Sequence, residues 1–317
     1  MVPLIDMETS LTHDQVLNEV GDALGVMDDI GMALMAPDGY QRAKDGQTKG
    51  YRWSSYILGL VNRYPGRFAP TANGGTNPNW LQQKGGKSKH YIDKLQKHVR
   101  TGVYAHMGEL DFRHYMSNSQ CKQGKTHRDS DIALNRENGH RLFKLAAETR
   151  VPFVVHLEPE DQALATLEEM LATYPDAPVI VAHFGQIRHP EKQQRFGPDL
   201  VRRLFGQYPN LYYDLAAGGP GRRYKCSNVA ADTVIWDGPL DGQRDHLHAQ
   251  YKALLTEFSD RFVMATDFGG GRKRLSEYLR EKVALLRLII RDLPDDARHN
   301  IGYRNAWKLL TGEAWSG

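Results

Sequence analysis

Cysteine is scarce in this 317-residue sequence, which contains only Cys121 and Cys226. Two cysteines do not indicate a disulfide framework, and they are typical of free thiols in a reducing compartment. No run of residues approaches the roughly 18 apolar residues that a membrane-spanning helix needs. The N-terminal segment lacks the basic and apolar regions of a signal peptide, although a signal peptide already removed would leave no trace. We therefore expect a cytoplasmic protein that has no membrane partner.

The sequence also lacks a large excess of one charge, since it contains 41 Lys and Arg residues and 38 Asp and Glu residues, and the net charge is +3. A binding surface for nucleic acid needs clustered basicity, so we expect no nucleic-acid partner. The sequence has no Gly-x-Ser-x-Gly motif, which argues against a serine hydrolase of the nucleophile-elbow type. It also lacks a Walker-type phosphate loop. These absences leave other kinds of enzyme and binding protein open.

Short apolar segments alternate with helical segments along the whole chain. The expected strands cover residues 2–7, 32–35, 68–72, 102–107, 153–156, 179–183, 211–215 and 262–267. The expected helices cover residues 14–29, 52–64, 89–100, 136–149, 162–174, 198–208, 243–258, 274–291 and 297–310. Parallel strands need crossover helices, so this alternation predicts a parallel α/β fold.

The number of strand–helix repeats favours a (β/α)8 TIM-like barrel, which typically needs about 250 residues. An open, doubly wound sheet is the alternative. We expect residues 1–317 to form a single domain, because no linker-like change of composition divides the chain. Two smaller domains would also be compatible with this length.

Residues able to bind a metal stand at the ends of several expected strands. They are Glu8, Glu109, His156, His183 and Asp267. The C-terminal ends of barrel strands converge on one mouth, where barrel enzymes place their active sites. Imidazole nitrogens combined with carboxylate oxygens suit zinc, manganese or iron. A single histidine at a strand end is more often a packed residue than a ligand, but five such residues together predict a metal site.

Three of these residues lie in motifs that resemble a known family. Val-Val-His156-Leu-Glu, Val-Ala-His183-Phe-Gly and Ala-Thr-Asp267-Phe-Gly resemble the fifth, sixth and eighth strand motifs of the amidohydrolase superfamily. Residues 300–310 resemble the closing helix of its amidohydrolase-2 group, which holds hydrolases and non-oxidative decarboxylases. The resemblance extends from residue 3 to residue 310. It implies a metal-dependent enzyme on a barrel fold.

The first strand departs from the family pattern Asp-x-His-x-His. Asp6 is followed by Glu8 and Ser10, which stand where the two histidines would be. The resemblance implies that Glu8 can still bind the metal, as a glutamate does in some decarboxylases, while a ligand role for Ser10 stays open. Glu109 resembles the strand-four glutamate that binds or bridges metal in some members. The alternative is that Glu109 has a structural role and forms a salt bridge with Arg113.

Basic residues follow several of the expected strands at the same mouth. Those predicted to bind substrate are Arg113, Lys122, Arg188, Arg222 and Arg223. Guanidinium groups bind carboxylate, phosphate or sulfonate in bidentate fashion. Each of these residues alone could simply lie in a solvated loop. Their concentration at one end of the expected barrel favours a small anionic substrate.

These observations predict a metal-dependent hydrolase in which a mononuclear divalent ion, Zn²⁺ or Mn²⁺, activates water. Asp267 would accept the proton of that water and return it to the leaving group, while His183 would bind the metal or polarise the substrate. The first alternative is non-oxidative decarboxylation of an aromatic or unsaturated acid, which Glu8 favours. The second is a non-catalytic binding barrel, which Ser10 motivates. Nothing in the sequence decides whether the protein is a homo-oligomer.

Overall fold

A computed structural model describes residues 1–40, 55–72, 91–115, 123–124, 129–186, 192, 194–216, 235, 246–269 and 273–316. The strands are β1 (Leu4–Thr12), β2 (Met32–Tyr40), β3 (Thr71–Ala72), β4 (His106–His114), β5 (Ser130–Asp131), β6 (Phe153–Leu157), β7 (Val179–Val181), β8 (Leu211–Asp214), β9 (Phe262–Val263) and β10 (Phe268–Gly269).

The α-helices are α1 (His13–Asn18), α2 (Val20–Ile30), α3 (Ser55–Arg63), α4 (Tyr91–Val99), α6 (Glu137–Thr149), α7 (Asp161–Thr173), α9 (Pro198–Gln207), α10 (Ala249–Glu257), α11 (Leu275–Arg291), α12 (Asp295–His299) and α13 (Asn305–Thr311). Two 3-10 helices, η2 (Ala182–Gln186) and η3 (Ser259–Arg261), and the π-helix η4 (Asn300–Arg304) complete the described elements.

The strands pair in parallel with their neighbours around a ring. One sheet has the order β10-β1-β2, and the other has the order β3-β4-β6-β7-β8-β9. A parallel bridge between Met35 and Phe68 connects β2 to the segment before β3, and a bridge between Asp6 and Met264 connects β1 to the segment after β9. The described strands therefore close on themselves in the order of a (β/α)8 barrel.

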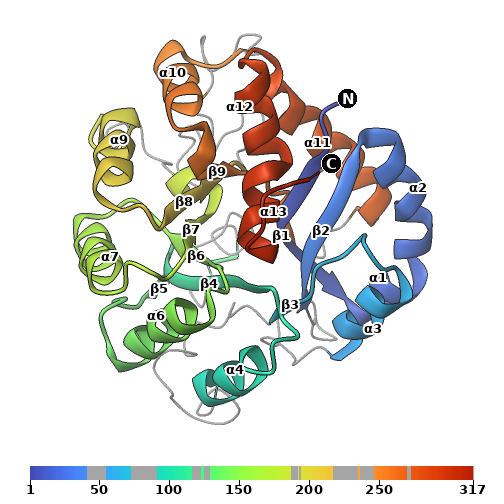
Figure 1. Cartoon of the computed structure of the whole chain (residues 1–317), viewed down its shortest axis with the longest axis horizontal. Helices are drawn as coiled ribbons and strands as arrows, with labels where there is room; N and C mark the ends of the chain where they lie inside the picture. The colour runs from blue at the N-terminus through green and yellow to red at the C-terminus, as the bar shows by residue number, and fades with distance from the viewer. Residues whose placement is uncertain are drawn as a thin grey trace.

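Helices surround these strands on the outside (Figure 1). β6 is buried along its whole length, because helices cover its outer side and the barrel interior covers its inner side. Its residues alternate between these sides: Phe153 and Val155 belong to the outer core, whereas Val154 belongs to the interior cluster. His156 shares the parity of Val154, so it points inward at the end of the strand.

The C-terminal helices cover the end of the barrel where the strands begin. Tyr303 and Ala306 pack in the same apolar cluster as Ile5 and Val263 from the barrel interior. Gly302 allows this close approach, since a Cβ there would lie 2.8 Å from the carbonyl oxygen of Pro3. In Figure 1, α13 lies across the strands accordingly. This closure leaves the opposite end, where the strands finish, for chemistry.

Several expected boundaries were wrong. The helix expected at 14–29 is divided into α1 and α2 at Glu19, whose Oε2 accepts a hydrogen bond of 2.6 Å from the backbone N–H of Leu275. The fourth strand was expected at 102–107, but β4 starts at His106, so Glu109 lies within the strand.

Two segments that were each predicted as a single element correspond to several elements in the structure. The strand expected at 179–183 ends at Val181, where η2 begins. The last expected helix, 297–310, is divided among α12, η4 and α13.

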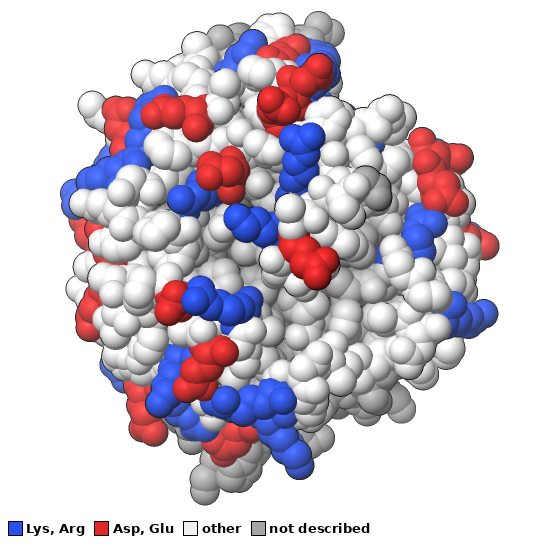
Figure 2. Space-filling view, viewed as in Figure 1, with Lys and Arg blue, Asp and Glu red and all other residues white. Residues whose placement is uncertain are grey.

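The surface gives two further observations. Among the described residues, no helix is long and apolar enough to cross a membrane. On the face drawn in Figure 2, the described acidic and basic side chains are interspersed, without a broad region of one sign.

Candidate metal centre

β1 places Glu8 at the mouth through a buried network around Asp6. The carboxylate of Asp6 accepts hydrogen bonds from the backbone N–H of Glu8 at 3.1 Å and from that of Thr266 at 2.8 Å. The Thr266 hydroxyl also donates to Asp6 at 2.7 Å, and the N–H of Asp267 donates to the carbonyl of Glu8 at 3.0 Å. Burial raises the pKa of Asp6 to about 6 against the lowering effect of these bonds. One carboxylate thus fixes the backbone beside both Glu8 and Asp267.

His183 lies directly after β7, in the first turn of η2. Its φ of 54° and that of Phe184, 52°, are in the left-handed region that residues other than glycine seldom occupy. The side chain of Asp214 supports this turn, because its Oδ1 accepts the N–H of His183 at 2.8 Å and that of Ala216 at 3.0 Å. Asp267 has a φ of 52° as well. Such backbone strain is commonly found at functional sites.

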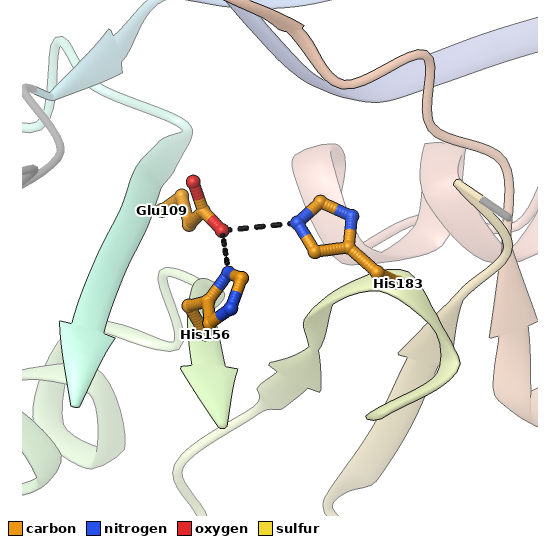
Figure 3. A group of neighbouring side chains, drawn as sticks. All are labelled: Glu109, His156 and His183. Carbon is orange, nitrogen blue, oxygen red and sulfur yellow. Dashed lines mark hydrogen bonds and ion pairs between the residues drawn. The ribbon is translucent and has the colours of Figure 1, made fainter. Parts of the chain in front are cut away.

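Glu109 lies between two imidazole rings (Figure 3). Its Oε1 lies 2.6 Å from Nδ1 of His156 and 3.0 Å from Nε2 of His183. Burial opposes ionisation of Glu109, but the charges and hydrogen bonds of the two histidines outweigh it and hold its pKa well below the usual value. Burial likewise opposes protonation of His156, yet Glu109 and Glu158 raise its pKa to about 10. The carboxylate and the imidazoles therefore stabilise each other's charged forms.

Glu8, His183 and Asp267 form a second group. One possible ligand atom from each lies within 4.8 Å of the others. Glu8 Oε2 is 3.4 Å from Nδ1 of His183. Burial first, then the negative charges of Asp214, Glu109 and Asp267, raises the pKa of Glu8 well above its usual value. The side chains of Glu8 and His183 are buried, whereas Asp267 is exposed at the mouth.

The hydrogen-bond inventory shows which group suits a cation. The carboxyl group of Glu8 contacts another acid, Asp214, and its Oε2 lies 3.4 Å from Nδ1 of His183. These groups are buried, and buried acids that face one another are stabilised by a neighbouring positive charge. By contrast, the atoms that join Glu109 to its histidines already have partners. The group of Glu8, His183 and Asp267 fits a divalent cation, because carboxylate oxygens and an imidazole nitrogen converge there within 4.8 Å of one another.

The five predicted ligands are therefore gathered in two adjacent groups. Glu109, His156 and His183 form one, and Glu8, His183 and Asp267 form the other. Within the part of the chain that the structure describes, no such group contains both His156 and Asp267. His183 belongs to both, and it turns a different ring nitrogen to each.

The predicted substrate-binding residues can be located only in part. Arg113 forms ion pairs with Asp129 at 2.8 Å and Glu160 at 2.9 Å, and its guanidinium stacks on Tyr115. Arg113 therefore does not pair with Glu109, whose partners are His156 and His183. The other predicted positions lie outside the described residues: Lys122, Arg188, Arg222 and Arg223.

Sequence reasoning missed several buried polar residues around the mouth. They are Asp6, Asp111, His114, Glu158 and Asp214. Two of them carried a usable signal, because Asp214 falls in the expected seventh strand and Glu158 follows His156 by two residues. Both are acidic residues near the C-terminal end of a barrel strand, which is the same signal that identified the five predicted ligands.

Comparison with known proteins identifies the family of this chain. A family model described as amidohydrolase matches residues 99–311, which is well over half of the chain. The chain belongs to this amidohydrolase family, as its strand motifs predicted. Membership confirms that it is an enzyme of the metal-dependent amidohydrolase type, a group of both hydrolases and decarboxylases. No curated protein matches the chain.

Solved structures agree on the fold. A dihydroxybenzoic acid decarboxylase from a Polaromonas species, with bound manganese and 2-nitroresorcinol, has a TM-score of 0.54 and 12% identity over 99% of this chain and 98% of that one. A probable 2-pyrone-4,6-dicarboxylic acid hydrolase from Acinetobacter baumannii, with bound citric acid, has a TM-score of 0.56 and 14% identity over 99% of this chain and 100% of that one. A 5-carboxyvanillate decarboxylase from Novosphingobium aromaticivorans, complexed with manganese and a nitrobenzoic acid, has a TM-score of 0.51 and 12% identity over 97% and 96%. These similarities confirm the predicted barrel class.

Proposed function

We propose that this enzyme is a metal-dependent hydrolase that acts on a small substrate bearing a carboxylate, phosphate or sulfonate group. The observation that carries the proposal is the convergence of the buried side chains of Glu8 and His183 with the exposed carboxylate of Asp267, whose ligand atoms lie within 4.8 Å of one another. Glu8, Nδ1 of His183 and Asp267 would hold the divalent cation, for which the manganese-bound structural neighbours favour Mn²⁺. A cation there supplies Lewis acidity, which lowers the pKa of water and polarises a substrate oxygen.

Asp267 is the group best placed to move protons. Its side chain is exposed to the mouth, while the carbonyl of Glu8 and the network around Asp6 fix its backbone. It accepts a proton from the attacking water and returns that proton to the leaving group. General acid–base catalysis of this kind contributes about 10²–10⁴-fold to rate.

His183 and Glu109 orient the centre. The carboxylate of Glu109 accepts the Nε2–H of His183, so Nδ1, on the side of Glu8, is the nitrogen that would release its proton to bind the cation. A carboxylate behind a metal-binding histidine fixes the tautomer and makes the imidazole more basic. The basic residues predicted from the sequence, Lys122, Arg188, Arg222 and Arg223, hold the anionic group of the substrate. Arg113 would join them only by leaving its pairs with Asp129 and Glu160.

A second candidate is decarboxylation on the same scaffold. Glu8 favours it, because it stands where the family pattern has histidine, and two of the structural neighbours above are named as decarboxylases. In that reaction, the basic residues hold the carboxylate that leaves as carbon dioxide. Asp267 then protonates the ring carbon.

Isotopic labelling separates the two reactions. Protein loaded with Mn²⁺ is incubated with a pyrone dicarboxylate and with dihydroxybenzoates, once in H₂¹⁸O and once in D₂O. Hydrolysis incorporates ¹⁸O into a product carboxylate, and decarboxylation releases carbon dioxide and leaves deuterium on a ring carbon. The hydrolase proposal predicts the first result. Release of carbon dioxide alone overturns it in favour of decarboxylation, and a protein that retains no metal after dialysis and converts neither class contradicts both.

A further inference from the structure

A tyrosine on α11 contacts the turn that carries Asp267. The hydroxyl of Tyr278 lies 2.8 Å from the carbonyl oxygen of Thr266 and 3.1 Å from the carbonyl oxygen of Asp267, and it donates to them. These two carbonyls belong to the peptide groups on either side of the Asp267 Cα atom. Because each peptide group is planar, the φ and ψ angles of Asp267 alone set their relative orientation. One hydroxyl therefore contacts both groups whose orientation fixes the direction of the Asp267 side chain.

The backbone of Asp267 needs support because its conformation is unfavourable. Its φ of 52° lies in the left-handed region, where the Cβ atom of an L-residue is crowded by the backbone. Such conformations persist only where the surrounding structure holds them. The N–H of Asp267 donates to the carbonyl oxygen of Glu8 at 3.0 Å, which holds the turn from the side of β1. Tyr278 holds the same turn from the side of α11.

The ring of Tyr278 is itself held in place. It packs against Phe268, with the two ring centroids 4.9 Å apart, and Phe268 is only 1% exposed. Tyr278 lies in the first turn of α11, whose first residue, Leu275, donates its N–H to Oε2 of Glu19 at 2.6 Å. The helix and the packed ring together bring the hydroxyl to the turn.

We propose that Tyr278 is a positioning residue for Asp267, whose hydroxyl holds the turn in the conformation that aims the Asp267 carboxylate at the metal centre. This inference rests on the proposed function, in which that carboxylate binds the cation and moves the proton. A misplacement of about 1 Å can cost about 10²-fold in rate. Loss of the hydroxyl should therefore impair the centre much more than it impairs the stability of the fold.

Tyr278→Phe tests this role, because it removes the hydroxyl and keeps the ring that packs on Phe268. We expect the affinity for Mn²⁺, measured by competition with a fluorescent chelator, to fall by about 10-fold, as for a group that orients a metal ligand. At saturating Mn²⁺, kcat should fall while KM stays near that of the unaltered protein. Tyr208→Phe is the matched control, since it removes a hydroxyl that donates to Glu168 at 3.2 Å, and it should change none of these quantities.

A double-mutant cycle with Asp267→Gly shows whether Tyr278 acts through Asp267. Glycine adopts a positive φ without strain but has no carboxylate to be aimed. Asp267→Gly alone should weaken Mn²⁺ binding, and Tyr278→Phe added to it should weaken binding no further. An equal loss of affinity from Tyr278→Phe in both backgrounds means that the hydroxyl supports the structure in general, which overturns the positioning role.

The remaining outcomes separate this inference from the proposed function. Unchanged Mn²⁺ affinity in Tyr278→Phe, together with weakened binding in Asp267→Gly, overturns the role of Tyr278 and keeps the proposed function. Unchanged affinity in Asp267→Gly removes Asp267 from the metal centre and contradicts both. Tyr278→Leu provides a second route if Tyr278→Phe fails to fold, and far-ultraviolet circular dichroism identifies folded variants.

Discussion

Nε2 of His183 lies 3.0 Å from Oε1 of Glu109, and this contact decides how the ring is used. Because the carboxylate accepts a hydrogen bond from Nε2–H, Nδ1 is the nitrogen that can give up its proton and bind a cation. Nδ1 is buried and lies 3.4 Å from Oε2 of Glu8. The contact therefore directs one ring nitrogen to a structural partner and the other to the proposed cation.

This arrangement predicts that Glu109→Gln weakens metal binding without removing a ligand from the Glu8 group. The amide has no charge to stabilise the N–H groups of His156 and His183. We expect the affinity for Mn²⁺ at that group to fall about 10–100-fold, as is typical for such outer partners. Competition with a fluorescent chelator measures it, and an unchanged dissociation constant would show that Glu109 does not orient His183.

Asp267→Asn tests the proton-transfer role. The amide keeps the size of the side chain but cannot accept a proton, so turnover should fall by at least about 10²-fold. The thermal unfolding temperature should change little, because the Asp267 side chain is exposed. Asp296→Asn, at a side chain that is 92% exposed, is the matched control and should keep full activity. An active Asp267→Asn protein removes Asp267 from the mechanism.

Thr266→Val tests the buried network that positions Glu8 and Asp267. The valine has a similar shape but removes the hydroxyl that lies 2.7 Å from Asp6 and 2.9 Å from the hydroxyl of Thr9. Leaving a buried carboxylate oxygen without this donor should lower the free energy of unfolding by about 1–3 kcal/mol. Thr173→Val, at an exposed position on α7, should change it by no more than about 0.5 kcal/mol. Equal urea midpoints for the two variants would refute the network's role.

The buried imidazole of His106 should make the free energy of unfolding decrease in acid. Burial lowers the pKa of His106 to about 3, while an unfolded chain titrates near the ordinary value of 6.5. Between these values the unfolded state binds a proton that the folded state does not, so stability is present above pH 6.5 and is lost as the pH falls toward 3. One pH unit corresponds to about 1.4 kcal/mol.

A non-titrating residue at this position should remove that contribution. Between pH 7 and pH 5, His106→Gln should lose about 2 kcal/mol less of its unfolding free energy than the unaltered protein. Urea unfolding at the two pH values measures the difference. If both proteins lose the same free energy, His106 does not titrate as its burial requires.

The sequence predicted the fold class because its signals were periodic. Buried strands such as 153–156 and amphipathic helices such as 136–149 repeat through the chain, and the structure has β6 and α6 at those positions. Sequence reasoning also selected Glu8, Glu109, His156, His183 and Asp267, because each is an acid or histidine near a strand end. Family motifs supported three of them.

The grouping of these residues could not be predicted, since it depends on local irregularities of the backbone. Glu8 lies where the register of β1 against β2 shifts, and Glu109 lies where the register of β4 against β6 shifts. Such irregularities re-aim side chains without a reliable sequence signal. His183 and Asp267 adopt left-handed backbone conformations that their residue types rarely take. Asp6 and Asp214 hold those turns from neighbouring strands that are distant in the sequence, so the sequence alone did not reveal their roles.

In the proposed metal centre, one divalent cation binds between Glu8, Nδ1 of His183 and Asp267. Anomalous diffraction from a crystal of the Mn²⁺-loaded protein, collected at the manganese edge, locates that cation directly. We expect an anomalous peak in contact with all three groups, with Nε2 of His183 still hydrogen-bonded to Glu109. A crystal in which Glu8 and His183 lie next to no anomalous peak, or in which the metal contacts Nε2 of His183 instead, would contradict it.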